Sequence, residues 1–246
     1  MNRVLAPHDT TVASAPARDD ELWAMYYVVR SDRRLSFGQA IALGGAGAVA
    51  CADRFRDSER WRANFTAWQA AEYPKVALRA RADQFAALTG IDATPVPTHA
   101  DPIALCLPPR RKSEREPELI ELAPFTDAKL PAEPPATPGA LVYIIRPGVI
   151  KSMGKAIAQA GHAALALADE MAATHRAELK HWREAGMPGE VRLADDRMWE
   201  PLKAAVECVV IRDAGYTQVA AGTETVLALP PLQEQPSIVT ELERLP

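Results

Sequence analysis

The sequence has little cysteine, few aromatic residues and no long apolar run. Its three cysteines, Cys51, Cys106 and Cys208, are far apart and lie in apolar surroundings, so we predict small buried side chains and not a disulfide or a metal site. No stretch approaches the roughly 20 apolar residues of a membrane-spanning helix, and the N-terminus lacks the apolar centre of a secretory signal. A reducing, cytoplasmic location fits free thiols.

Basic residues are not in excess either. The chain contains 28 lysines and arginines against 32 aspartates and glutamates, which gives a formal net charge of -4. Proteins that wrap nucleic acid usually carry a basic excess, so any contact with nucleic acid is expected to be a local patch. The 246 residues are long enough for one large domain or two small ones.

What the sequence does contain is an internal repeat. Residues 24–49 align without a gap to residues 140–165, and ten of the 26 aligned pairs are identical. Ordinary residue usage would give roughly two identities. The match continues weakly, since Trp68 and Pro74 correspond to Trp182 and Pro188. A repeat of this length indicates two copies of one structural unit.

The repeat divides the chain into five segments. A polar arm, predicted to be disordered, covers residues 1–21, a first copy covers 22–109, a linker rich in proline and charge covers 110–138, a second copy covers 139–234, and a tail covers 235–246. In each copy β-branched apolar runs alternate with helical patterns. The fold class is therefore α/β, with two tandem copies of a small α/β sandwich of about four strands each.

A polar stripe distinguishes the second copy from the first. Lys155, Gln159 and His162 are spaced i, i+4, i+7 and so share one face of a helix that Ser152 can cap. Lys155 lies in the first turn, where free backbone N–H groups attract anions. The corresponding residues of the first copy are Gln39, Leu43 and Ala46. Packing alone therefore does not demand the stripe, although an incidental solvated helix face stays an alternative.

A second polar cluster follows a strand of the second copy. The segment "RDAGYTQVAAGTETVLAL" places Asp213, Thr217, Gln218, Thr223 and Thr225 in and beside a loop between two strands. Such side chains at strand ends are typical of functional sites, although a turn capped by Asp213 explains them as well. The first copy has no equivalent loop. Because both features are absent from the same copy, we predict one site in the second half.

These two segments resemble the signatures of the type-2 peptidyl-tRNA hydrolase family, which is familiar from archaea and eukaryotes. The resemblance covers residues 139–231, and the first copy shares it only through the repeat. It implies a small mixed sheet flanked by helices and an association of two such units. We therefore expect the two copies to pack as a pseudo-dimer within one chain, the first copy being an inactive partner. The positions that match are Lys155, Gln159, His162, Asp213, Thr217, Gln218, Gly222, Thr223 and Thr225.

The resemblance implies hydrolysis of the ester that joins a peptide to tRNA, by direct attack of water. Asp213 would orient or deprotonate the water, and Lys155 would stabilise the oxyanion or a tRNA phosphate. Thr217 and Thr225 would donate or relay hydrogen bonds, and His162 would be a general acid or base or a structural group. Gln159, Gln218, Gly222 and Thr223 would bind substrate. No cofactor, metal or protein partner is implied, and the oligomeric state stays open.

Two alternatives to this function remain at the level of the sequence. One is a binding or scaffold protein that keeps the fold without catalysis, which the acidic balance favours. The other is an esterase that acts on a different acyl conjugate.

Overall fold

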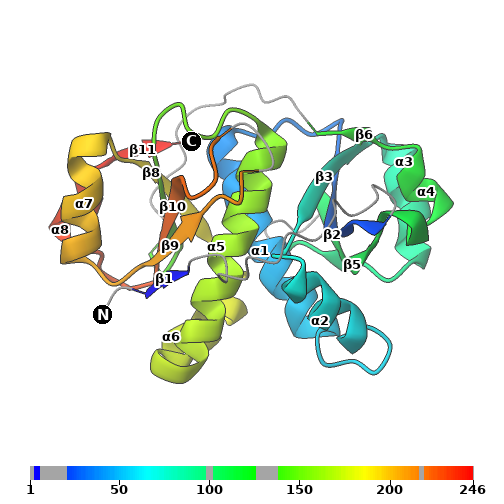
Figure 1. Ribbon diagram of the computed structural model, residues 1–246, viewed down its shortest axis with the longest axis horizontal. Helices are drawn as coiled ribbons and strands as arrows, with labels where there is room; N and C mark the ends of the chain where they lie inside the picture. Colours follow the sequence, from blue (N-terminus) through cyan, green and yellow to red (C-terminus); the bar gives the residue numbers. More distant parts are fainter. Residues whose placement is uncertain (1–2, 6–20, 98–101, 126–137, 216–218, 246) are drawn as a thin grey trace.

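Two mixed sheets form, one in each half of the chain, with two long helices between them (Figure 1). The computed structural model describes residues 3–5, 21–97, 102–125, 138–215 and 219–245. The N-terminal half, residues 21–125, contains β2 (Trp23–Arg30), α1 (Phe37–Phe55), α2 (Arg62–Ala70), β3 (Lys75–Ala80), α3 (Ala82–Ala87), η2 (Leu88–Gly90), β4 (Thr94–Pro95), β5 (Ala104–Arg111), η3 (Lys112–Glu114), α4 (Pro117–Ile120) and β6 (Ala123–Pro124).

The C-terminal half, residues 138–245, repeats this order. It contains β7 (Leu141–Ile145), α5 (Met153–Thr174), α6 (Arg176–Glu184), β8 (Gly189–Leu193), α7 (Asp196–Ala205), β9 (Val209–Arg212), β10 (Glu224–Leu229), α8 (Ser237–Thr240) and β11 (Glu243–Leu245). A strand from the start of the chain, β1 (Arg3–Leu5), joins its sheet in parallel with β9.

The two sheets have corresponding strand orders. One runs β4-β5-β2-β3-β6, and the other runs β9-β10-β7-β8-β11 with β1 added beside β9. Among the five corresponding strands the pairing senses also agree: β2–β3 and β7–β8 are parallel, and the other three pairs of each set are antiparallel. The expected α/β class with two tandem units is confirmed. The sheets have five and six strands, where about four were expected.

Helices α1 and α5 pack against each other through small residues. Tyr27 Oη donates to the carbonyl of Gly44 at 2.9 Å, and a Cβ added to Gly161 would lie 2.4 Å from the same Tyr27 Oη. The reverse contact also occurs, since a Cβ on Gly45 would lie 1.7 Å from Tyr143 Oη. Each half thus inserts a tyrosine over a glycine of the other helix, which is the reciprocity of an isologous interface. One apolar core includes both halves.

The turns that precede β3 and β8 are equivalent. Trp68 Nε1 donates to the carbonyl of Pro74 at 2.7 Å, and Trp182 Nε1 donates to that of Pro188 at 2.8 Å. The weak sequence match around these residues therefore corresponds to one local structure made twice. This equivalence supports the duplication that we infer from the sequence.

The described first part of the expected linker, residues 110–125, contains regular structure. β5 continues to Arg111 and includes Pro108 and Pro109, and β6 adds a further strand to the sheet. The prolines lie where the register between β2 and β5 shifts, so the missing N–H groups interrupt the ladder at an irregularity. Arg110, which the sequence analysis placed in the linker, is buried against Trp61 and paired with Glu116.

The two chain ends also differ from expectation. Residues 3–5 of the arm form β1, and the tail forms α8 and β11, of which β11 pairs antiparallel with β8. Short strands at the edge of a sheet carry too little periodicity to be read from sequence. The three cysteines are buried and free, as predicted. Within the described ranges, no helix is long and apolar enough to cross a membrane.

The interface between the halves predicts the effect of one added methyl group. A Cβ on Gly44 would lie 2.4 Å from the carbonyl oxygen of Ile157 on α5, so Gly44→Ala must push two helix backbones apart. We expect a loss of about 1–3 kcal/mol or more in unfolding free energy, measured by urea unfolding. Both halves should unfold in one transition because they share a core. The control is Gly90→Ala, where nothing lies within 4 Å; equal stability of the two variants would contradict the prediction.

Candidate functional site

The N-terminal turns of α5 carry two of the predicted site residues. Ser152 caps the helix, its Oγ accepting from the N–H of Lys155 at 3.3 Å. The side chains of Lys155 and Gln159 then extend toward the end of β9 and the start of β10, both of which α5 contacts. The helix therefore holds the polar side chains against the loop that follows β9.

Four of the predicted residues form one buried polar network. Lys155 Nζ pairs with Asp213 Oδ2, and Gln159 Nε2 donates to the same oxygen at 2.7 Å. Thr225 Oγ1 donates to Gln159 Oε1 at 2.8 Å. Asp213 is 3% exposed, Gln159 5% and Thr225 0%. The amide of Gln159 bonds a carboxylate with one end and a hydroxyl with the other, which fixes its orientation.

The loop after β9 is folded around Asp213. Its Oδ1 accepts from the N–H of Gly215 at 2.8 Å. Its backbone N–H donates to the carbonyl of Thr223 at 2.8 Å, and its own carbonyl accepts from the N–H of Gly222 at 2.7 Å. Gly215 and Gly222 adopt positive φ of 84° and 81°, which the absence of a Cβ permits. The hydroxyl of Thr223 donates to the carbonyl of Ala220 at 2.7 Å and so serves the turn, not the network. Thr217 and Gln218 lie outside the described residues.

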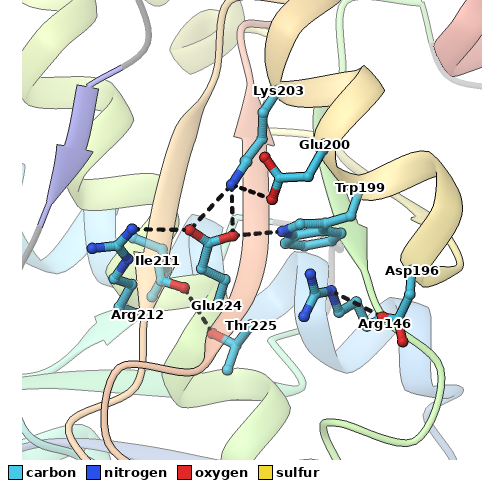
Figure 2. A network of polar contacts seen from close by, with 9 residues as sticks. All are labelled: Arg146, Asp196, Trp199, Glu200, Lys203, Ile211, Arg212, Glu224 and Thr225. Atoms are coloured by element: carbon cyan, nitrogen blue, oxygen red, sulfur yellow. Dashed lines mark hydrogen bonds and ion pairs between the residues drawn. The ribbon is translucent and has the colours of Figure 1, made fainter.

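A second polar network lies on the opposite face of β10 and was not predicted. Glu224 accepts from Trp199 Nε1 at 2.7 Å, from Lys203 Nζ at 2.9 Å and from Arg212 at 3.1 Å (Figure 2). Because neighbouring strand residues point to opposite faces, anchoring Glu224 directs Thr225 toward Gln159. The register of β9 and β10 also shifts between Glu224 and Val226. In the sequence, the alternation in "TET" indicated that neighbouring side chains point to opposite faces of the strand, but it did not show which residues they would contact.

His162 faces the N-terminal half and is not bonded to Asp213. Its Nδ1 lies 3.1 Å from Nζ of Lys75, the first residue of β3. Burial, then the charges of Lys75 and Lys155, hold the pKa of His162 well below its usual value, so the imidazole is neutral at pH 7. Burial also lowers the pKa of Lys75. Helical spacing predicted the shared face but not this neighbour, which comes from the other half.

The corresponding place in the N-terminal half is built without these groups. Gln39, which replaces Lys155, turns back to the N-terminus of its own helix, where it completes a capping box with Ser36. Leu43 and Ala46 are buried in the core. A cavity of about 220 Å³ lies beside Gln39 and Leu43. Among the described residues no three His, Cys, Asp or Glu side chains are grouped to hold a metal ion.

Comparison with known proteins finds a family that the half carrying the site resembles. Residues 140–242 match the model of the family described as peptidyl-tRNA hydrolase PTH2. This match confirms the family resemblance for the C-terminal half.

Individual relatives agree with the family match. The human protein named "Peptidyl-tRNA hydrolase 2, mitochondrial" is 30% identical over 97 residues, which are 37% of this chain and 54% of that protein. The protein of the same name from Bos taurus is 32% identical over 97 residues, with the same coverage. The chain therefore spans about half the length of the curated relatives that it matches.

The Glu224 network predicts a dependence of stability on pH. Burial alone would raise the pKa of Glu224, but hydrogen bonds from Lys203, Trp199 and Arg212 outweigh it and lower the pKa to about 2. The side chain is thus charged above its unfolded pKa and contributes stability there, which is lost as pH falls from about 4.5 toward 2. We expect Glu224→Gln to unfold more easily by roughly 3 kcal/mol at pH 7.

That difference should shrink as the pH is lowered through this window, since protonated glutamate and glutamine are then alike. The measurement is urea unfolding of both proteins at several pH values between 2 and 7. A gap that stays constant with pH would show that Glu224 acts through packing and not through its charge.

Proposed function

We propose that the chain hydrolyses the ester between peptide and tRNA, with the site in its C-terminal half. The observation that carries this proposal is the buried polar network of Lys155, Asp213, Gln159 and Thr225. The two signature segments lie 50 residues or more apart, yet their side chains meet in one network, and the same residues fall within the stretch that matches the family.

Asp213 is suited to orient and activate a water molecule. Within the described part of the chain its carboxylate accepts from Lys155, Gln159 and the N–H of Gly215. A carboxylate offers about four lone-pair sites, so the contacts of the described residues leave one site on Oδ1 for a water. The three donors hold the carboxylate in one orientation, which a general base or a water-positioning group requires.

Lys155 is suited to stabilise the negative charge that develops on the attacked carbonyl. It lies in the first turn of a helix of 22 residues, where the positive end of the helix dipole adds to its own charge. A charged donor fixed before the reaction stabilises an oxyanion without reorganisation. A phosphate oxygen of tRNA would also bind well beside Lys155. We assign the oxyanion to Lys155 because its pairing with Asp213 places it next to the group that we propose activates the water.

The other signature residues support these two groups. Gln159 orients Asp213, and Thr225 fixes Gln159. Gly222 and Thr223 shape the loop. From the resemblance to the family, we propose that Thr217 donates a hydrogen bond and that Gln218 binds substrate. His162 is proposed to act as a neutral hydrogen-bonding group, because its low pKa leaves little imidazolium at pH 7. In the proposed reaction water is the nucleophile, so neither a Ser or Cys nucleophile nor a cofactor takes part.

Catalysis is tested by two substitutions in the network. Asp213→Asn removes the base, and Lys155→Ala removes the charged donor. We expect each to lower turnover of peptidyl-tRNA by about 10²-fold or more, measured by release of tRNA from labelled peptidyl-tRNA. The matched control is Lys180→Ala on α6, an exposed lysine paired only with Glu184 in the described contacts.

Three outcomes separate the proposal from its alternatives. Loss in both variants with normal turnover in the control supports the proposed site. Wild-type protein that binds peptidyl-tRNA without cleaving it would indicate a binding or scaffold protein. Cleavage of other acyl esters but not of peptidyl-tRNA would indicate an esterase. The relatives are named mitochondrial, and the cytoplasmic location and an active monomer stay predictions.

A further inference from the structure

The exposed side of α5 meets side chains from the N-terminal half at the end farther from Asp213. The Tyr73 ring lies edge-on to His162, with centroids 6.3 Å apart. Lys75 Nζ lies 3.1 Å from His162 Nδ1, 3.1 Å from the carbonyl of Tyr73 and 4.8 Å from the centroid of the Trp68 ring. Two aromatic rings and one lysine amine are thus gathered beside His162, the last residue of the polar stripe.

The turn that presents this cluster adopts an unusual backbone conformation. Glu72 and Tyr73 have φ of 63° and 59°, a region that bulky residues rarely occupy. Tyr73 is nevertheless 36% exposed, one of the few large apolar side chains of the described residues that is open to solvent. The equivalent turn of the C-terminal half repeats the conformation, since Gly186 and Met187 have φ of 83° and 56°. The backbone shape therefore belongs to the turn, and what distinguishes the first turn is the exposed ring that it carries.

The repeat provides an internal comparison. The equivalents of Tyr73 and Lys75 are Met187 and Gly189, which follow Trp182 and Pro188 at the same spacing. Met187 is buried, and a Cβ on Gly189 would lie 2.9 Å from Ala42 of α1. The same turn therefore carries an exposed aromatic ring and a lysine where it faces α5, and buried or absent side chains where it faces α1.

The cluster lies within reach of the reaction centre. About 10 Å of helix separates Lys155 from His162, and Lys155, Ala158 and His162 are the partly exposed positions between them. A substrate whose ester lies at Asp213 can extend along this face. α5 contacts β9 and β10 of its own half on one side and β3 of the other half on the other (Figure 1).

We propose that Tyr73 and Lys75 of the N-terminal half form a subsite for the terminal nucleotides of the RNA substrate. This inference rests on the proposed function and names the part of the substrate that the N-terminal half binds. Tyr73 stacks against an unpaired base, as aromatic side chains do with single-stranded RNA. Lys75 donates to a ribose or phosphate oxygen. The N-terminal half is then not an inert partner, since it completes the site of the other half.

The test uses the full chain and two labelled RNA hairpins, one with the single-stranded CCA end of tRNA and one blunt. Tyr73→Ala should weaken binding of the CCA hairpin by about 5- to 150-fold, the range for one lost base–aromatic stack. Tyr73→Phe should bind within about threefold of wild type, since it keeps the ring. The blunt hairpin should show no difference. Lys75→Met, which keeps the stem over Gly161, should also weaken CCA binding, and Lys180→Met is its control.

Stability is measured alongside, and Tyr73→Asn guards against misfolding because asparagine tolerates positive φ. In turnover assays, loss of the ring should raise KM for peptidyl-tRNA and leave kcat nearly unchanged. Equal affinity of wild type, Tyr73→Ala and Tyr73→Asn for the CCA hairpin would overturn the subsite. So would an equal loss with the blunt hairpin. CCA binding that depends on Tyr73 in a chain without turnover would support the subsite and refute the proposed hydrolysis.

Discussion

The close approach of α1 to α5 is the constraint on which the rest of the structure depends. At Gly44 the carbonyl of Ile157 lies where a side chain would begin, and at Gly45 and Gly161 the tyrosines of the opposite half fill that space. Where the helices approach this closely, a position such as Gly44 admits no larger residue, because interiors are close-packed and a methyl group must displace backbone. The identities between the copies are concentrated in these helices for that reason. Contacts across a shared interface restrict both copies alike, whereas surface and loop positions are free to diverge.

The same packing determines which side of α5 is available for chemistry. With one side against α1 and the flanks against β9, β10 and β3, only a narrow face that includes Lys155 and His162 is partly open. The Lys155–Asp213 pair at its edge has lost much of its hydration. A buried ion pair is stable only if further hydrogen bonds replace that hydration, and the donors from Gln159 and Gly215 do so. The site and its supports are therefore one unit, and removing a member leaves a buried charge without its partners.

Sequence patterns predicted one part of this arrangement well and missed another for physical reasons. Helical spacing placed Lys155 and Gln159 on one face, and the strand–loop–strand pattern placed Asp213 and Thr225 opposite, so the core of the site could be anticipated. The contact between His162 and Lys75 could not be anticipated, because Lys75 comes from the other half and its position relative to α5 depends on how the two long helices cross. The continuation of β5 to Arg111 was also missed, because the shift in register that accommodates Pro108 and Pro109 cannot be predicted from a local pattern. The contacts of Glu224 were hidden in the same way, as a strand pattern names its face but not what packs there.

The asymmetry between the halves follows from the cost of burying polar groups. The helix position of Gln159 is matched by Leu43, which is 1% exposed. A glutamine there would need partners like Asp213 and Thr225. In the first half the strand that corresponds to β9 is β4, only Thr94–Pro95, and the residue just before β5 is the buried, apolar Ile103. An unsatisfied buried polar group costs about 1–3 kcal/mol. The stripe is therefore unfavourable without the polar groups of the loop, and without the stripe Asp213 would be a buried carboxylate lacking two of its donors. The two features thus depend on each other. Tyr73 and Lys75 belong to the half that has neither feature, and this dependence does not extend to them, because they contact the helix of the other half.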